Sequence, residues 1–330
     1  MIYPWQRNQW QQVEQLLKSE RLPHAILLVG NQGLGKAEFA ITLANALLCK
    51  QTTADNQACG HCQMCTLLAA NTHPDFYYLK PTASESSKSK NPVLNIRIDD
   101  IRSLCGKLNQ TSQYGGYRVA ILDKADHLTI AAANSLLKTL EEPGQNVLIL
   151  LVTARPQRLP VTIRSRCQLL RFTEPDQIQS LDWLRQKQLQ DFTPVQLQQA
   201  LKYAHGSPLA ALGYLQEAEH YKLLAEAMTA GLSGKNSLEH ALKLTKYDKT
   251  QTLEGMLVWV SDLTRLMACG PEVEITNELY RVKLQALAKR VNQQRLFHFH
   301  DQLNFNLLHS SIAVNEQLLW ENLLLSWDNL

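Results

Sequence analysis

A glycine-rich loop between an apolar run and a helical pattern limits the folds open to this chain more than any other feature. Residues 30–36 have the sequence GNQGLGK, which follows the apolar run 24–29 and precedes a helical stretch at 37–48. This is the G-x-x-x-x-G-K pattern, in which backbone N–H groups surround phosphates at a helix N-terminus and the lysine reaches the outer phosphates. The candidate nucleotide-binding residues are therefore Gly30, Gly33, Gly35 and Lys36.

The rest of the first half repeats this alternation of strands and helices. Apolar runs at 76–79, 117–122 and 147–152 are strand candidates, and helical patterns such as 130–140 lie between them. Strands that alternate with helices predict a parallel sheet covered on both faces. The predicted fold class of this half is α/β, with a polar, Ser-rich surface loop at 81–92.

Helical patterns replace the strand signals after residue 172. The sequence TEP at 173–175 is typical of a boundary, and HGSP at 205–208 interrupts the Gln- and Leu-rich helical patterns that follow. We therefore predict α/β plus all-α organisation in three domains, namely an α/β domain over 1–172, a small helical domain over 173–207 and a larger helical domain over 208–330.

The charge and hydropathy of the chain exclude several function classes. Its 33 Lys and Arg residues against 30 Asp and Glu residues give a net charge of +3, which rules out a polybasic chain that coats nucleic acid by bulk charge. No apolar run approaches the roughly 18 residues that a membrane span needs. The first residues lack a basic region followed by an apolar core, so we expect no secretory signal and a cytoplasmic protein.

Four of the seven cysteines crowd into residues 49–65. In an intracellular chain such a cluster holds metal more often than it forms disulfides. Four thiolates fill a tetrahedral Zn²⁺ shell with no open position, which predicts a structural zinc site. Unliganded thiols or a redox pair are the alternatives, and His61 within the cluster is a substitute ligand. The predicted zinc ligands are Cys49, Cys59, Cys62 and Cys65.

The phosphate site lacks residues that catalysis usually needs. The residue after the loop lysine is normally Ser or Thr, whose hydroxyl binds Mg²⁺, and here it is Ala37. The run VAIL ends in Asp123, a metal-side carboxylate, but Lys124 stands where a water-positioning Glu is expected. We therefore expect that ATP and Mg²⁺ do not bind productively. A bound but unhydrolysed nucleotide and an empty architectural turn both stay open, because the glycines and Lys36 are intact.

Two further segments carry a family resemblance. NSLLKTLEEP at 134–143 and LPVTIRSRC at 159–167 closely resemble the signature of AAA+ clamp-loader proteins. With the four-cysteine insertion, the altered phosphate loop and the C-terminal helical region, the chain is similar from end to end to subunits of the bacterial DNA polymerase III clamp loader. The resemblance implies a RecA-like AAA+ domain with a zinc module at 49–65, a small helical lid and a helical collar that joins subunits.

The resemblance also implies a role for Arg166. In the family, Ser165-Arg166-Cys167 is the motif whose arginine projects across a subunit interface onto the γ-phosphate in a neighbour's site. A guanidinium supplied in this way stabilises the charge that develops during phosphoryl transfer. Active loaders usually carry a further arginine in the lid, where this chain has Leu209, and the sensor position near Thr153 is ambiguous.

Two functions fit these residues. The first is a non-hydrolysing stator of the clamp loader, which is a non-catalytic subunit of the DNA polymerase holoenzyme. In this role Arg166 would contact the ATP bound by a neighbouring subunit. The implied partners are the γ/τ motor subunits and a δ subunit, with the sliding clamp and primed DNA reached through the complex. The alternative is an ATP-hydrolysing motor subunit, which Ala37 and Lys124 disfavour. The net charge of +3 disfavours a third function, an autonomous zinc protein that binds DNA.

Overall fold

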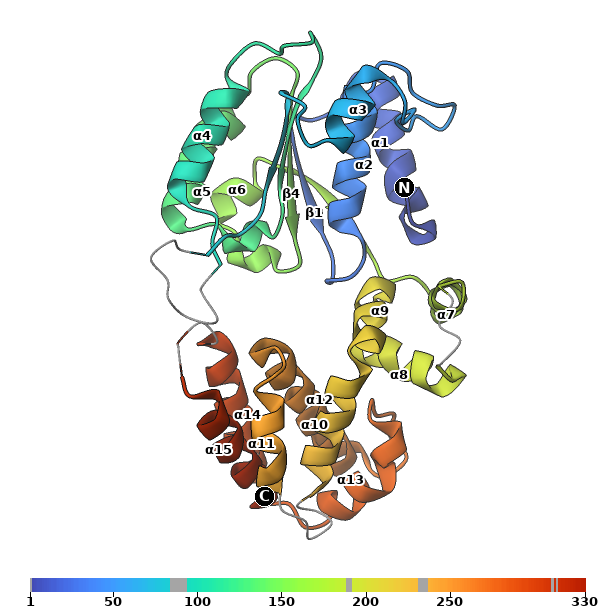
Figure 1. Ribbon diagram of the computed structural model, residues 1–330, viewed down its shortest axis with the longest axis vertical. Helices are drawn as coiled ribbons and strands as arrows, with labels where there is room; N and C mark the ends of the chain where they lie inside the picture. The colour runs from blue at the N-terminus through green and yellow to red at the C-terminus, as the bar shows by residue number, and fades with distance from the viewer. Residues whose placement is uncertain (1, 84–93, 188–191, 231–236, 310–311, 313) are drawn as a thin grey trace. The chain divides into compact units, whose positions relative to one another are not determined.

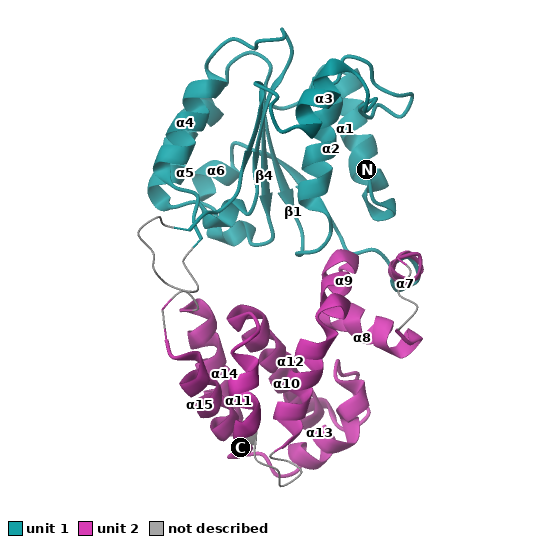
Figure 2. Cartoon of the chain, viewed as in Figure 1, with its two compact units in different colours: residues 1–87, 92–179 teal, residues 88–91, 180–330 magenta. Residues whose placement is uncertain are grey.

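The computed structural model describes residues 2–83, 94–187, 192–230, 237–309, 312 and 314–330. The chain divides into two compact units, which Figure 2 shows in different colours, one over residues 1–87 and 92–179 and the other over 180–330 with 88–91. The Ser-rich loop predicted at 81–92 lies outside the described residues from position 84 onward.

A five-stranded parallel sheet in the order β2-β3-β4-β1-β5 forms the centre of the first unit (Figure 1). The strands are β1 (Ala25–Val29), β2 (Phe76–Leu79), β3 (Arg118–Leu122), β4 (Val147–Thr153) and β5 (Gln168–Arg171). The first four match the apolar runs, which confirms the α/β prediction for this part of the chain. β5 is not among the predicted strands, because it lies at an edge of the sheet and only Leu170 of its side chains is buried.

Helices cover both faces of this sheet (Figure 1). One face packs with α1 (Arg7–Lys18), α2 (Lys36–Leu48) and α3 (Gln63–Ala69), and the other with α4 (Ile98–Leu108), α5 (Ile130–Glu141) and α6 (Val161–Arg164). Side chains alternate along each strand, so Leu28 belongs to the core that contains α2, and Leu27 to the core that contains α5. Short 3₁₀ helices complete the unit at η1 (Pro4–Gln6), η2 (Ala125–His127) and η3 (Pro156–Arg158).

Helices make up the second unit, in agreement with the patterns after residue 172. They are α7 (Gln177–Arg185), which crosses the boundary, α8 (Pro194–Tyr203), α9 (Pro208–Gln216), α10 (Ala218–Ala230), η5 (Ser237–His240), α11 (Ala241–Leu244), α12 (Lys249–Cys269), η6 (Glu278–Tyr280), α13 (Arg281–Ala288), α14 (Gln293–Leu308) and α15 (Glu316–Asp328). Their core contains the buried indoles of Trp259, Trp320 and Trp327. The division of this unit at residue 207 into a lid and a collar stays a prediction. No helix among the described residues is long and apolar enough to cross a membrane.

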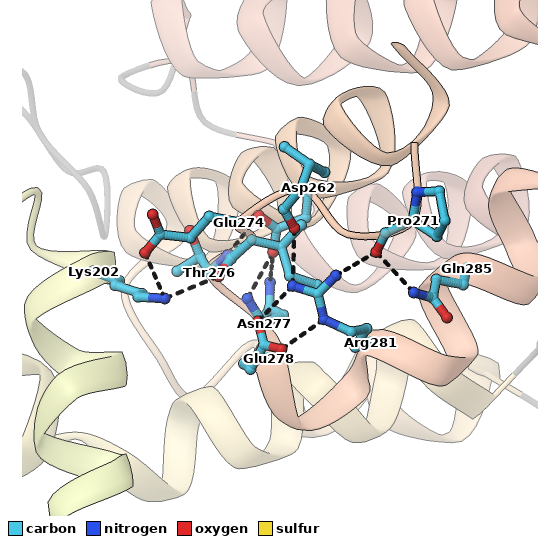
Figure 3. A network of polar contacts seen from close by, with 11 residues as sticks. Lys202, Asp262, Pro271, Glu274, Thr276, Asn277, Glu278, Arg281 and Gln285 are labelled. Carbon is cyan, nitrogen blue, oxygen red and sulfur yellow. Dashed lines mark hydrogen bonds and ion pairs between the residues drawn. The ribbon is translucent and has the colours of Figure 1, made fainter. Parts of the chain in front are cut away.

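A buried carboxylate of α12 binds the segment that follows this helix (Figure 3). Asp262 of α12 is fully buried and accepts hydrogen bonds from the backbone N–H groups of Thr276 (2.8 Å) and Asn277 (2.7 Å). It also accepts one from the Asn277 side-chain amide (2.9 Å). The Tyr203 hydroxyl of α8 donates to the amide oxygen of Asn277. Three donors of the segment after α12 therefore share one buried acceptor group, and Asn277 in turn contacts the end of α8.

We expect Asp262→Ala to lower the free energy of unfolding by about 3 kcal/mol, because the backbone N–H groups that it binds are left without their acceptor. Glu274→Ala is the matched control on the same segment. Glu274 pairs with Lys202 at 2.8 Å, but its side chain is 78% exposed, so we expect a loss of at most about 1 kcal/mol. Urea unfolding of the full chain measures the free energy of unfolding of both variants. Equal unfolding midpoints for the two variants would contradict the stabilising role of Asp262.

Candidate functional site

The parallel strands bring the predicted nucleotide-site residues to one edge of the sheet. Loop 30–36 follows β1, Asp123 follows β3, and Thr153 is the last residue of β4. Strands that run in the same direction end at the same edge, which is where ligands of such sheets bind. Arg166 is instead on the segment between α6 and β5, and Leu209 is on α9 in the second unit.

The phosphate loop closes on itself through its lysine. Lys36 Nζ donates to the carbonyl oxygens of Gly30 (2.7 Å) and Asn31 (2.6 Å), and the residue is 5% exposed. Burial lowers the pKa of Lys36 to about 8, although nearby carboxylates, Asp123 first among them, act in the opposite direction. Ala37 follows as the second residue of α2 and adds only a methyl group. The ammonium that would meet phosphates is thus bound by carbonyls of its own loop.

The N-terminal segment covers this loop. Trp5 Nε1 donates to the carbonyl of Leu34 (3.0 Å), and Gln6 Nε2 donates to the carbonyls of Leu34 and Gly35 (2.8 Å each). Gly35 has a φ of 77°, and a Cβ there would lie 2.6 Å from the ring of Tyr3, so this approach requires glycine. No motif indicates such a cover in the sequence, because the hydrogen bonds join residues 28 or 29 positions apart.

The carboxylate after β3 is already engaged. Asp123 Oδ2 accepts from the Tyr78 hydroxyl (2.9 Å), and Oδ1 accepts from the backbone N–H of Lys124 (2.9 Å). Lys124 has a left-handed backbone with a φ of 51°, and it is exposed. A second carboxylate, Asp126 on η2, accepts from Thr153 Oγ1 (2.8 Å). Sequence reasoning missed Asp126, although its place three residues after Asp123 was a usable signal.

The predicted cysteines form one cluster. The sulfur atoms of Cys49, Cys59, Cys62 and Cys65 all lie within 4.8 Å of one another, and the shorter separations are 3.6, 3.6, 3.8 and 3.9 Å. A tetrahedral Zn²⁺ with Zn–S bonds of about 2.3 Å requires sulfur separations of about 3.8 Å. The side chains therefore have the arrangement of a tetrahedral four-sulfur metal site.

The surroundings of the sulfurs fit a metal as well. Backbone N–H groups of Gln51 (3.4 Å) and Cys59 (3.3 Å) point to Cys49 Sγ. A backbone hydrogen bond lowers the pKa of Cys62 to about 6, whereas burial raises the pKa of Cys65 to about 12. A divalent cation would deprotonate every thiol that it binds. His61, the substitute ligand, is not part of the cluster, and its Nδ1 lies 2.9 Å from the carbonyl oxygen of Cys59.

Arg166 is held by two acceptors. Its Nη2 lies 2.6 Å from Glu141 Oε1 at the end of α5, and its Nη1 donates to the carbonyl of Thr162 on α6 (2.9 Å). The Arg166 side chain is still 35% exposed. Ser165 donates to the same carbonyl (3.2 Å), and burial raises the pKa of Cys167 to about 12. The motif therefore has a partly buried thiol beside a partly exposed guanidinium, and no sequence pattern indicates the contact with Glu141.

The parallel sheet, the phosphate loop after β1 and the carboxylate after β3 define an α/β protein of the P-loop type. A family model described as DNA polymerase III, delta subunit, matches residues 5–176. A second model, described as DNA polymerase III, delta subunit, C terminal, matches residues 215–329.

Similar proteins of known name identify the family more narrowly. The DNA polymerase III subunit delta′ of Escherichia coli is 31% identical over 98% of this chain and 94% of that protein. Its counterpart in Pseudomonas aeruginosa is 41% identical over 64% of this chain and 60% of that protein. The chain belongs to the family of DNA polymerase III delta′ subunits. Among solved structures, a gamma subunit-related protein of DNA polymerase III from Thermotoga maritima covers 96% of this chain and 99% of its own, at 18% identity and a TM-score of 0.47.

We expect the purified chain to carry about one metal ion in a tetrahedral four-sulfur site. Cys59→Ser removes one ligand and should reduce the bound metal to less than about half an atom per chain. Cys105→Ser, which changes a thiol outside the cluster, should leave it unchanged. Elemental analysis after gentle purification measures the content. Full metal retention by Cys59→Ser would contradict the four-cysteine site.

Proposed function

We propose that this chain is a non-hydrolysing stator of the DNA polymerase III clamp loader. Membership of the delta′ family supports a place in this complex, which loads a sliding clamp onto primed DNA. The observation that carries the proposal is the binding of Lys36 Nζ by the carbonyls of Gly30 and Asn31. The proposed partners are the γ/τ motor subunits and a δ subunit in a hetero-oligomeric ring, and the proposed location is the cytoplasm.

Productive binding of Mg²⁺ and ATP needs groups that this site lacks. Ala37 offers no hydroxyl to the metal. Both oxygens of Asp123 already accept hydrogen bonds within the chain. Lys124 cannot position water as a carboxylate does, and it adds positive charge at that place. Each deficiency removes a different part of the reaction, so hydrolysis by the chain itself is not part of the proposed role.

The state of Arg166 supports a role at a neighbour's ATP site. A guanidinium is permanently charged and planar, and it suits the equatorial oxygens of a phosphoryl group in transfer. Arg166 is partly exposed, unlike Lys36, and it follows Ser165 in the motif that the clamp-loader signature contains. We propose that it acts in trans as an arginine finger on the γ-phosphate bound by the adjacent motor subunit.

A structural zinc ion in the module at 49–65 belongs to the same proposal. The four sulfurs occupy all four positions of a tetrahedral ion, which leaves no position for a substrate or water. The metal would then stabilise the insertion between α2 and β2 and would perform no catalysis. We further propose that residues 173–207 act as a lid and that residues 208–330 act as the collar through which subunits assemble.

An ATP-hydrolysing motor subunit is the alternative function, favoured by the intact glycines and by Lys36. We expect the purified chain to hydrolyse ATP no faster than its Lys36→Ala variant, with or without primed DNA, because the hydroxyl ligand for Mg²⁺ and the water-positioning carboxylate are missing. Steady-state phosphate release measures the rate. Turnover typical of an AAA+ motor that Lys36→Ala abolishes would refute the stator and support the motor.

We expect Arg166→Ala to lower ATP hydrolysis by about 10³-fold at the one site that the finger reaches, as in related phosphoryl-transfer systems. The measurement is DNA-stimulated, single-turnover hydrolysis by the loader reconstituted with motor and δ subunits. Arg164→Ala is the control, because Arg164 is an exposed arginine two positions earlier. Equal rates for the two variants in fully assembled loaders would remove Arg166 from the mechanism.

A further inference from the structure

The contacts of Arg166 come from two different helices. Glu141, the last residue of α5, binds Nη2 at 2.6 Å. The carbonyl of Thr162 on the short helix α6 binds Nη1 at 2.9 Å, and Ser165 Oγ lies 3.5 Å from the same nitrogen. α5 and α6 lie on the same face of the sheet (Figure 1). The guanidinium is therefore fixed relative to the first unit and not only to its own loop.

Both acceptors of Arg166, Glu141 and the carbonyl of Thr162, lie at the C-terminal ends of helices, where a positive charge is favoured. The last carbonyls of a helix have no partner within it and carry partial negative charge, which describes Thr162 in a helix that ends at Arg164. Glu141 puts a carboxylate at the end of α5, where negative charge is unfavourable for the helix dipole. A positive group between the two ends offsets both effects. Arg166 is the residue that occupies this position.

The contacts leave part of the guanidinium available. Arginine has five N–H donors in a fixed planar arrangement. The contacts to Glu141, Thr162 and Ser165 use at most three of them, so at least two remain for an oxygen outside the chain. The side chain is 35% exposed, which gives such an oxygen access. Lys36 differs, because it is 5% exposed and donates hydrogen bonds to two carbonyls of its own loop.

We infer that Glu141 is a positioning residue for Arg166, which it holds in the orientation needed for a neighbouring phosphate. This inference rests on the proposed finger role of Arg166. A free arginine side chain loses much rotamer freedom when it is ordered at the moment of reaction, and a guanidinium that is already held loses less. The benefit appears in the chemical step, so kcat depends on Glu141 and the KM for ATP does not.

The test measures DNA-stimulated ATP hydrolysis by the reconstituted loader. We expect Glu141→Ala to lower kcat about three- to fivefold, which is the range that a partly exposed ion pair supplies, with the KM for ATP unchanged. Glu142→Ala is the matched control, because Glu142 is the next residue, is exposed and makes no ion pair with any residue that the structure describes. Its kcat should equal that of the unmodified loader.

The double variant shows whether Glu141 acts through Arg166. If it does, Arg166→Ala with Glu141→Ala has the same kcat as Arg166→Ala alone. Multiplied losses in the double variant would mean an independent role, and would overturn the inference. An unchanged or raised kcat for Glu141→Ala, beside a lowered kcat for Arg166→Ala, would also overturn it and leave the proposed function intact. An unchanged kcat for Arg166→Ala would instead refute the finger itself.

Discussion

The ammonium of Lys36, bound by the carbonyl oxygens of Gly30 and Asn31, is the interaction on which the rest of the site depends. Lys36, the first residue of α2, thus satisfies two carbonyls that follow β1, and the side chain of Gln6 donates to the carbonyls of Leu34 and Gly35 in the same loop. A phosphate would have to replace charge-assisted hydrogen bonds that contribute about 1.5–3 kcal/mol each. These hydrogen bonds stabilise the loop as a turn between strand and helix, which suits the proposed non-hydrolysing role.

Lys36 and Arg166, both in the first unit, differ in burial and in what binds them. Lys36 is buried and closed off by its own loop, whereas Arg166 is held by α5 and α6 and stays partly exposed. A buried cation whose hydrogen bonds go to acceptors of its own chain stabilises the fold. A partly exposed cation with unused N–H donors can bind an acceptor on another molecule. This difference, together with membership of the delta′ family, is the physical basis for the proposal that the chain acts at a subunit interface.

Much of this was predictable from local patterns in the sequence. Apolar runs predicted β1 to β4, and the spacing of the thiols from Cys49 to Cys65 predicted the cluster, because both depend on residues close together in the chain. Long-range contacts were not predictable. Gln6 reaches Gly35 across 29 positions, and Arg166 reaches Glu141 between two helices, with no motif to indicate either pair. β5 was missed for a related reason, since an edge strand with one buried side chain has little hydrophobic signal.

One comparison tests the assignment most directly. Loaders are assembled with Lys36→Ala or with Arg166→Ala in this chain, and single-turnover ATP hydrolysis is measured with primed DNA. If the chain acts on a neighbour's nucleotide and not on its own, Arg166→Ala slows hydrolysis and Lys36→Ala leaves the rate per assembled loader unchanged. The opposite result, with a loss for Lys36→Ala and none for Arg166→Ala, would mean that this chain hydrolyses ATP itself and would contradict the stator function.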